Sequence, residues 1–169
     1  QFLSFLQIYE CIKMHVVDLI SIDRIQCDLA INSKKKVLEK ISQIFTDDVS
    51  SLDSSEIFKC LVGREKLGST GIGHGVAIPH ARMKSNHNKA LGVFIRLKNS
   101  IEFDAIDNKP VNLLFALLVP SLSNDEHLEI LSNLAKMFSD EELCRQLRQA
   151  KECEDTYSII RRWEEKKIH

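Results

Sequence analysis

The chain has 169 residues, of which 44% are hydrophobic and 28% are charged, and these proportions are ordinary for a globular domain. Its 23 lysines and arginines are matched by 24 aspartates and glutamates, which gives a formal net charge of −1. Such a length is enough for one domain with its own core, and such a charge balance excludes a strong electrostatic attraction to nucleic acid or to an anionic membrane.

Residues 1–13 differ from the chain that follows. Most of residues 2–12 are apolar, yet they lack the basic start and the small-residue cleavage site of a signal peptide. No apolar run in the chain is long enough to cross a bilayer, so no membrane insertion is expected. We predict that residues 1–13 are an upstream extension and that residues 14–165 form the domain. An extra helix packed on the domain is the alternative for residues 1–13.

Two helices are predicted in the first half of the domain. Apolar side chains recur at helical spacing in residues 33–45. A second helix is predicted to begin at Asp53, with Glu56 three residues later in a capping-box arrangement, and to end near Gly68. This places Arg64 in the last turn of the second helix, directed toward the glycine-rich stretch that follows.

The glycine-rich stretch at residues 68–75 is the most informative part of the chain, and it leads directly to Pro79 and His80. Glycine lets the backbone approach a ligand closely, and successive free N–H groups in such a loop form an anion site. Pro79 fixes the backbone just before His80. A histidine that accepts a phosphoryl group needs a neutral ring held beside such a site. The predicted acceptor is therefore His80, and the predicted phosphate-binding loop contains Ser69, Thr70, Gly71 and Gly73.

Three strands are predicted around and after the glycine-rich stretch. A short strand covers residues 76–78 and a longer one covers residues 91–97, while residues 111–119 are almost continuously apolar, as in a strand buried on both faces. A helix then follows, capped by Asn124 or Asp125. His127 falls in its first turn, where the positive end of the helix dipole favours a phosphate.

The rest of the chain is predicted to be helical. Ser139 and Glu142 are expected to form a capping box for a short helix, and a last helix carries Trp163. Strands and helices follow one another without a repeat or a low-complexity linker. We therefore predict a single α/β domain with a central mixed β-sheet flanked by helices.

The five cysteines and the histidines show no metal-binding pattern. The cysteines form no C-x-x-C pair, and the chain has no H-E-x-x-H or H-x-x-x-H motif, so neither a metal nor a cofactor is predicted. Since the cysteines are scattered without a close pair, we expect buried thiols in a reducing cytoplasm and no disulfide framework. They are Cys11, Cys27, Cys60, Cys144 and Cys153.

Competing interpretations exist for the glycines and for the candidate residues. Val76 stands where a G-x-G-x-x-G motif needs its third glycine, and His74-Gly75 replaces the Lys-Ser/Thr pair of a P-loop. His80 has a plain structural alternative as a strand cap, and Arg64 as a charge that complements the helix dipole. For His127 the alternative is an ordinary residue of a first helical turn.

Three blocks of the sequence resemble the type-2 enzyme IIA domain of the bacterial sugar phosphotransferase system, most of all its nitrogen-regulatory branch. The first block is the stretch 64–82 with its Ile-Pro-His sequence. The second reads Ile101-Glu102-Phe103-Asp104-Ala105-Ile106-Asp107-Asn108-Lys109-Pro110-Val111. The third is His127-Leu128, followed by Leu131 and Leu134-Ala135-Lys136. The similarity as a whole extends over about residues 14–160.

The resemblance implies a role for each matching residue. His80 is implied to accept the phosphoryl group, normally on Nε2 in this family, and His127 to stabilise that group as the second histidine of the site. Arg64 is implied to neutralise phosphate. Ser69 and Thr70, with the glycines around them, match the loop that closes on the site. His74 stands where other members often carry a polar residue such as asparagine, so the resemblance implies least about the role of His74.

The resemblance also implies the function. We expect a phosphohistidine relay that receives its phosphoryl group from an HPr/NPr-type phosphocarrier and that regulates a partner, such as a potassium transporter or a sensor kinase, through its phosphorylation state. One alternative is a sugar-specific enzyme IIA of the fructose or mannitol type that passes phosphate to an enzyme IIB. The other is a vestigial module that acts only by binding.

Overall fold

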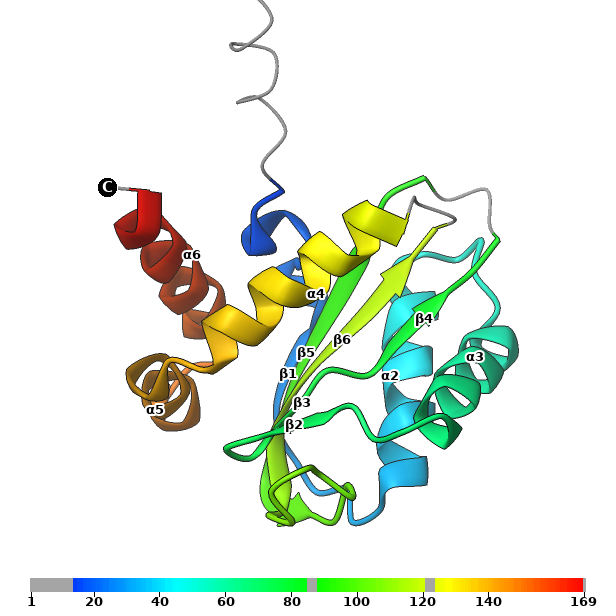
Figure 1. Ribbon diagram of the computed structural model, residues 1–169, viewed down its shortest axis with the longest axis horizontal. Helices are drawn as coiled ribbons and strands as arrows, with labels where there is room; N and C mark the ends of the chain where they lie inside the picture. The colour runs from blue at the N-terminus through cyan, green and yellow to red at the C-terminus, as the bar shows by residue number, and fades with distance from the viewer. Residues whose placement is uncertain (1–13, 85–87, 121–123, 169) are drawn as a thin grey trace, which may run out of the picture.

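The computed structural model describes residues 14–84, 88–120 and 124–168. In this part of the chain a mixed six-stranded sheet lies at the centre, with helices on both of its faces (Figure 1). The predicted α/β domain with a central mixed sheet is therefore confirmed. Residues 1–13, with Cys11, lie outside the described ranges, so the predicted extension stays a prediction.

The elements follow one another in chain order. Two short 3-10 helices, η1 (Val16–Asp18) and η2 (Ile22–Arg24), lead into β1 (Ile25–Leu29). Helices α2 (Lys34–Asp48) and α3 (Ser54–Lys66) come next. The strands that follow are β2 (Gly71–Gly73), β3 (Val76–Ala77), β4 (His80–Arg82), β5 (Leu91–Ile101) and β6 (Val111–Val119). The chain then forms α4 (Asn124–Phe138), α5 (Glu141–Gln149) and α6 (Asp155–Ile168).

Strand β6 organises the sheet because it pairs with three other strands. It runs antiparallel to β5 and parallel to both β3 and β4. The last two lie one after the other along the same edge of β6, with Val76 opposite Leu113 and His80 opposite Leu117. Pro79 cannot donate a hydrogen bond, but its carbonyl accepts one from the Leu117 N–H at 2.8 Å. This succession of strands fixes His80 against the middle of the sheet.

Two apolar layers form the core, one on each face of the sheet. Alternate residues of a strand point to opposite faces, so Phe94 packs toward α4–α6 while Val93 and Ile95 pack toward α2 and α3. In β6, Phe115 and Leu114 divide between the layers in the same way. Figure 1 shows this sandwich, with α2 and α3 on one side and the three C-terminal helices on the other.

Of the helix caps predicted at Asp53 and Ser139, the first is confirmed and the second is wrong. Ser33 caps α2 by accepting from the Lys36 N–H, and Asp53 caps α3 as predicted. The predicted capping box at Ser139 is wrong. The carboxylate of Asp140 accepts from the Glu142 and Leu143 N–H groups and so caps α5, while the Ser139 hydroxyl donates to the Lys136 carbonyl at the end of α4.

The prediction of free thiols is wrong for two cysteines. Cys27 in β1 and Cys153 before α6 form a disulfide, with their Cα atoms 5.7 Å apart. They are 126 residues apart in sequence, and spacing gives no signal for such a pair. Cys60 and Cys144 are free, and Cys144 is buried as predicted. In the described ranges no helix is long and apolar enough to cross a membrane.

Candidate active site

His80 begins β4 and lies half-buried, where the last turn of α3 and the first turn of α4 meet the sheet. Its Nδ1 atom is 2.9 Å from the carbonyl oxygen of Ile78. A carbonyl can only accept a hydrogen bond, so this contact assigns the ring proton to Nδ1. Nε2 is then left with a lone pair, which accepts from Arg64.

Arg64 lies in the last turn of α3, as predicted, and its side chain also reaches His80. Its Nε donates to His80 Nε2 at 3.1 Å, and its Nη1 donates to the Gly68 carbonyl at 2.7 Å. The second bond belongs to the end of α3, where the chain turns into the glycine-rich stretch. One guanidinium group therefore joins the acceptor candidate to the turn that leads into the predicted loop.

His127 lies in the first turn of α4, and its ring faces that of His80. The two ring centroids are 5.5 Å apart, with an angle of 56° between the ring planes. Nδ1 of His127 is buried and has no hydrogen-bond partner among the residues that the structure describes. A buried polar atom without a partner calls for an explanation, and an absent ligand is one. The structure thus brings together three residues from three separate elements.

The surroundings of both rings favour their neutral forms. Burial lowers the pKa of His80 below its ordinary value, and the positive charge of Arg64 lowers it further, while the hydrogen bond to Ile78 and the charge of Glu65 act in the opposite direction. Burial also lowers the pKa of His127, and His80, Arg82 and Arg64 add to this effect. Both imidazoles are therefore neutral near pH 7, which is the state that a nucleophilic ring nitrogen requires.

Two residues beside the candidate site were not predicted from the sequence. Arg82 is exposed and lies two residues after His80 on β4, hence on the same face of that strand. The spacing His-x-Arg in a strand was the signal that could have found it. Glu65 is nearly buried, pairs with Lys34 at 2.8 Å and accepts from both the N–H and the hydroxyl of Thr70. Its ion-pair partner Lys34 is distant in sequence, so no local sequence pattern indicated the role of Glu65.

The predicted phosphate-binding loop is placed only in part beside His80. Thr70 is close, since its carbonyl accepts from the Ile78 N–H at 2.9 Å. Gly73 is not close to His80. It pairs with Val76, which lies opposite Leu113 of β6, whereas His80 lies opposite Leu117, four residues further along that strand. At about 3.3 Å per residue this is roughly 13 Å.

The backbone N–H groups expected to bind phosphate already have partners within the protein. The Thr70 N–H donates to Glu65, and the Gly71 N–H donates to the hydroxyl of Ser69 at 3.0 Å. That hydroxyl in turn donates to the Phe103 carbonyl at 2.6 Å. At the far tip of the hairpin the His74 N–H donates to Asp107. The stretch is a hydrogen-bonded β-hairpin, and in this structure it does not present the ring of free N–H groups that its glycines predicted.

Packing explains why residue 71 is a glycine. A Cβ atom there would lie 2.7 Å from the Cβ and 2.9 Å from the Cα of Ala105, which is closer than such atoms approach one another. The glycine thus allows β2 to lie against the segment after β5. The close approach that the sequence predicted is real, but it is made to another part of the chain and not to a ligand.

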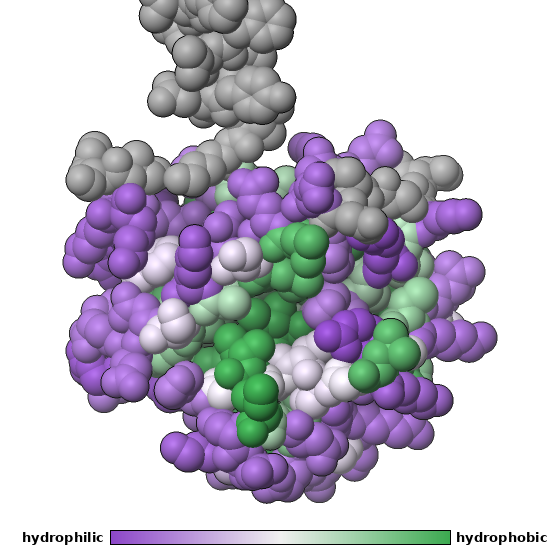
Figure 2. Space-filling view, in the orientation of Figure 1, coloured by the Kyte–Doolittle hydropathy of each residue, from purple (hydrophilic) through white to green (hydrophobic). Residues whose placement is uncertain are grey.

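An apolar surface surrounds the candidate site. Leu67, three residues after Arg64, is 85% exposed, and Leu128, next to His127, is 62% exposed. Figure 2 shows apolar side chains gathered over the face between α4 and the β2–β3 hairpin, with polar residues around them. Exposed apolar surface of this kind marks contact with a partner. No group of acidic, histidine or cysteine side chains suited to a metal occurs in the described part of the chain.

Comparison with known proteins finds a matching family model and similar proteins. A family model described as "Phosphoenolpyruvate-dependent sugar phosphotransferase system, EIIA 2" matches residues 18–163. The nitrogen regulatory protein of Klebsiella oxytoca is 48% identical over 128 residues, which are 76% of this chain and 78% of that protein. A fructose-specific EIIA component of Haloferax volcanii is 31% identical over 128 residues, 76% of this chain and 82% of that protein.

A solved structure shows the same fold at a similar level of identity. The crystal structure of nitrogen regulatory protein IIA-Ntr from Neisseria meningitidis matches with a TM-score of 0.80 and 41% identity, over 86% of this chain and 98% of that one. The family match, the fold and the level of identity lead to one conclusion. The chain belongs to the EIIA type-2 family of the phosphoenolpyruvate-dependent sugar phosphotransferase system.

Proposed function

We propose that this chain is a phosphorylatable regulator of the phosphotransferase system, and that Nε2 of His80 accepts the phosphoryl group from a phosphohistidine on an HPr/NPr-type carrier. One observation carries the assignment to Nε2. The carbonyl of Ile78 holds the proton on Nδ1, so the lone pair is on Nε2, which faces Arg64. A neutral ring with this tautomer is a nucleophile in its resting state.

The transfer itself needs no metal and no water. Nε2 of His80 forms a bond to phosphorus while the nitrogen–phosphorus bond of the carrier breaks, and the carrier's imidazole keeps that electron pair. Arg64 must then leave Nε2, since the new bond uses its lone pair. The guanidinium, still held by Gly68, turns its remaining donors to the phosphoryl oxygens, for which its planar fork is suited.

The side chains of Arg64, Arg82 and His127 balance the negative charge of the phosphoryl group. A phosphoryl group brings nearly two negative charges. Arg64 meets them directly, and Arg82 adds a second guanidinium on the same face of β4. The ring of His127, 5.5 Å from that of His80, donates an N–H to the phosphate and thereby gains the partner that its buried nitrogen lacks. The Gly68 carbonyl positions Arg64, and it stands directly before Ser69, Thr70, Gly71 and Gly73, to which we assign a supporting role.

The carrier is proposed to dock on the apolar surface that includes Leu67 and Leu128. A regulatory role is favoured because the nitrogen regulatory relatives are 48% and 41% identical to the chain, against 31% for the fructose-specific component. The regulated partner is proposed to be a transporter or sensor kinase, for instance one that handles potassium. We place residues 14–165, as the functional unit, in the cytoplasm, where such carriers act.

Intact-mass measurement tests this proposal. The chain is incubated with phosphoenolpyruvate, enzyme I and either HPr or NPr, and we expect one added phosphoryl group that disappears in His80→Ala. His74→Asn is the matched control, because His74 lies at the far tip of the β2–β3 hairpin. His127→Ala should slow phosphorylation or shorten the lifetime of the product.

Each other outcome excludes part of the proposal. Phosphorylation that survives in His80→Ala means that another residue is the acceptor. A chain that neither carrier phosphorylates is a binding-only module. Rapid onward transfer to a fructose- or mannitol-type enzyme IIB favours the sugar-specific alternative.

A further inference from the structure

A cavity lies between α5 and α6, away from the candidate active site. Its volume is about 640 Å³, within the range of sites for small organic ligands. Figure 1 shows α5 and α6 at the opposite end of the molecule from α3 and β4. Nothing in the proposed phosphoryl transfer uses this cavity or its residues.

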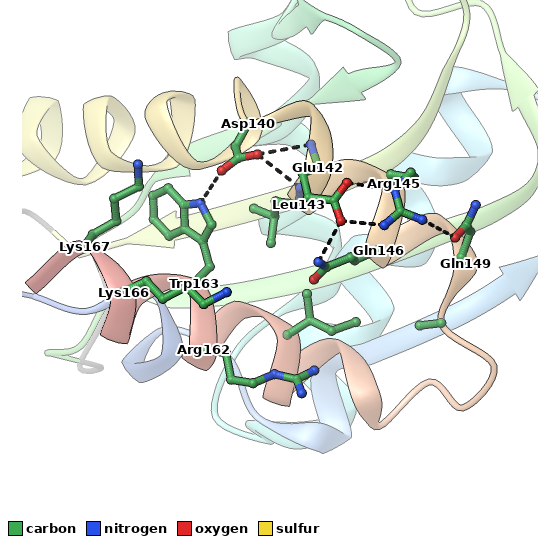
Figure 3. Close-up of a pocket in the computed structure, with 12 residues that line it drawn as sticks. Asp140, Glu142, Leu143, Arg145, Gln146, Gln149, Arg162, Trp163, Lys166 and Lys167 are labelled. Carbon is green, nitrogen blue, oxygen red and sulfur yellow. Dashed lines mark hydrogen bonds and ion pairs between the residues drawn. The ribbon is translucent and has the colours of Figure 1, made fainter. Parts of the chain in front are cut away.

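The wall formed by α5 is held in place by hydrogen bonds (Figure 3). Arg145 donates to Glu142 at 2.8 Å and to Gln149 at 2.7 Å, and Gln146 donates to Glu142 at 3.0 Å. These bonds hold the pKa of Glu142 down, at about 2, so it is ionised at any physiological pH. Glu142 is therefore already paired within α5. The other carboxylate that lines the cavity, Asp140, accepts hydrogen bonds from the Trp163 indole and from the backbone N–H groups of Glu142 and Leu143.

The wall formed by α6 carries two positive charges. Arg162 and Lys166 both line the cavity, one helical turn apart on the same face of α6. In the described ranges neither forms an ion pair or a hydrogen bond, although Lys166 is close enough to Glu142 to stabilise its charge. Two neighbouring cations at the rim of a cavity provide the donors that phosphate oxygens require.

An aromatic ring and aliphatic side chains supply the other half of the cavity. The Trp163 indole N–H donates to the Asp140 carboxylate at 2.8 Å, and this bond fixes the plane of the ring. The ammonium of Lys167 lies 5.5 Å from the ring centroid. Leu143 and Ile159 also line the space. An anion without an apolar part would leave this surface unused, whereas a planar ring would cover it.

We propose that the cavity between α5 and α6 binds an organic phosphate of the nucleotide class. The phosphates bind to Arg162 and Lys166, and the base packs against Trp163 and the aliphatic side chains beside it. The site is independent of His80, so a nucleotide at this end of the molecule and a phosphoryl group at the other are compatible.

The single tryptophan of the chain makes a direct test possible. Because Trp163 is the only tryptophan and lines the cavity, its fluorescence reports occupancy without a label. The full chain is titrated with ATP, GTP and AMP, and we expect a saturable change in emission. In Arg162→Gln and in Lys166→Gln the dissociation constant should rise by about tenfold or more, as for a lost charge-assisted hydrogen bond.

Arg161→Gln is the matched control, because Arg161 is an exposed neighbour on α6 that pairs with Glu165 and does not line the cavity. It should bind nucleotide as the unchanged chain does. Absence of a saturable change with all three nucleotides overturns the proposal, as does an equal loss of affinity in Arg161→Gln. Inorganic tripolyphosphate that binds as tightly as ATP excludes the role of the ring. A glutamate-rich peptide that binds more tightly than ATP assigns the surface to a protein partner instead.

Discussion

At the scale of single residues, Arg64 connects the chemistry of the candidate site to the local structure around it. It donates to His80 Nε2 from Nε and to the Gly68 carbonyl from Nη1, two donors that the planar guanidinium holds at a fixed separation. An ammonium group on a flexible stem keeps the charge but does not offer that planar pair of donors. A substitution can therefore separate the two proposed roles of Arg64, which are to place hydrogen-bond donors beside His80 and to neutralise the charge of the phosphoryl group.

The substitution Arg64→Lys tests this separation. We expect the rate of phosphoryl transfer to fall by about tenfold or more, since the planar pair of donors that the guanidinium offers to the phosphoryl oxygens is lost. Stopped-flow or quenched-flow phosphorylation by the carrier measures the rate. Lys66→Ala, an exposed change in the same helical turn, controls for altered surface charge and should transfer at nearly the normal rate. Unaltered kinetics in Arg64→Lys would reduce Arg64 to a helix-terminal charge.

The lowered pKa values of the two histidines predict a pH dependence. His80 and His127 both have a pKa below the ordinary 6.5, mainly because of burial. The transfer rate should thus stay near its maximum as pH falls through 6.5 and decline only below it. NMR titration of the two imidazoles, with a free histidine peptide as the reference, measures the shift directly.

The same shift predicts the sign of a stability change. Because the unfolded histidines bind protons at a higher pH than the folded ones, the stabilising contribution is complete above pH 6.5 and is lost as pH falls through the folded pKa values. The free energy of unfolding should therefore decrease below pH 6.5 in the unchanged chain. In His80→Gln the decrease should be smaller. Identical pH profiles of the two proteins would mean that burial of His80 does not favour its neutral form.

At the scale of elements, the contact between β2 and Ala105 decides what residue 71 can be. Gly71→Ala places a methyl group 2.7 Å from the Ala105 Cβ, against backbone that cannot rotate away. We expect a loss of about 1–3 kcal/mol in the free energy of unfolding. Gly63→Ala is the matched control in α3, where nothing lies within 4 Å of the new methyl group, and it should stabilise the chain by about 1 kcal/mol.

Urea unfolding of both variants measures these two opposite changes. If Gly71→Ala were as stable as the unchanged chain, β2 would not be packed closely on the segment after β5. The glycine would then be explained better by a ligand, as its place in a glycine-rich stretch first indicated.

Helices and strands with a regular pattern of apolar residues were predictable from the sequence. Short strands that form only because neighbouring strands pair with them were not. Helix α2 has a regular apolar face and a serine cap, and the continuously apolar β6 was predicted with its bounds. Strands β2 and β4 have three residues each, too short to show a period, and they exist because β3 and β6 offer them partners. For this reason the glycine-rich stretch was expected to be an open loop.

The residues of the candidate site divide in the same way. His80 was indicated by the glycine-rich stretch and the Ile-Pro-His sequence, whereas Arg64 and His127 were assigned to the site through the family resemblance. Glu65 was not, because its partner Lys34 lies on another helix. Its importance depends on a contact that only the folded chain makes.

At the scale of the whole molecule, the disulfide between Cys27 and Cys153 joins the beginning and the end of the domain covalently. It joins β1 to the start of α6 and closes a loop of 126 residues in sequence separation. Arg96 reinforces the same junction by bonding both Asp28 and the carbonyl of Ala150. The C-terminal helices are thereby attached to an edge of the sheet that is far from them in sequence.

Reduction of this bond should lower the free energy of unfolding by about 2–4 kcal/mol, because the unfolded chain regains the freedom of a long loop. Urea unfolding with and without a thiol reductant measures the difference, and Cys27→Ser should reproduce it without reductant. Cys60→Ser, at a free cysteine, should leave the response to reductant unchanged. Alkylation of both Cys27 and Cys153 in the native, unreduced protein would contradict the bond itself.

The central claim is that Nε2 of His80 is the atom that receives the phosphoryl group, and one measurement tests it most directly. The chain is labelled with ¹⁵N-histidine, phosphorylated through its carrier and examined by long-range ¹H–¹⁵N NMR. We predict that only Nε2 of His80 changes to the shift of a phosphorylated nitrogen, while Nδ1 keeps its proton and its bond to the Ile78 carbonyl. A phosphoryl group on Nδ1 of His80, or on any other histidine, would contradict the account.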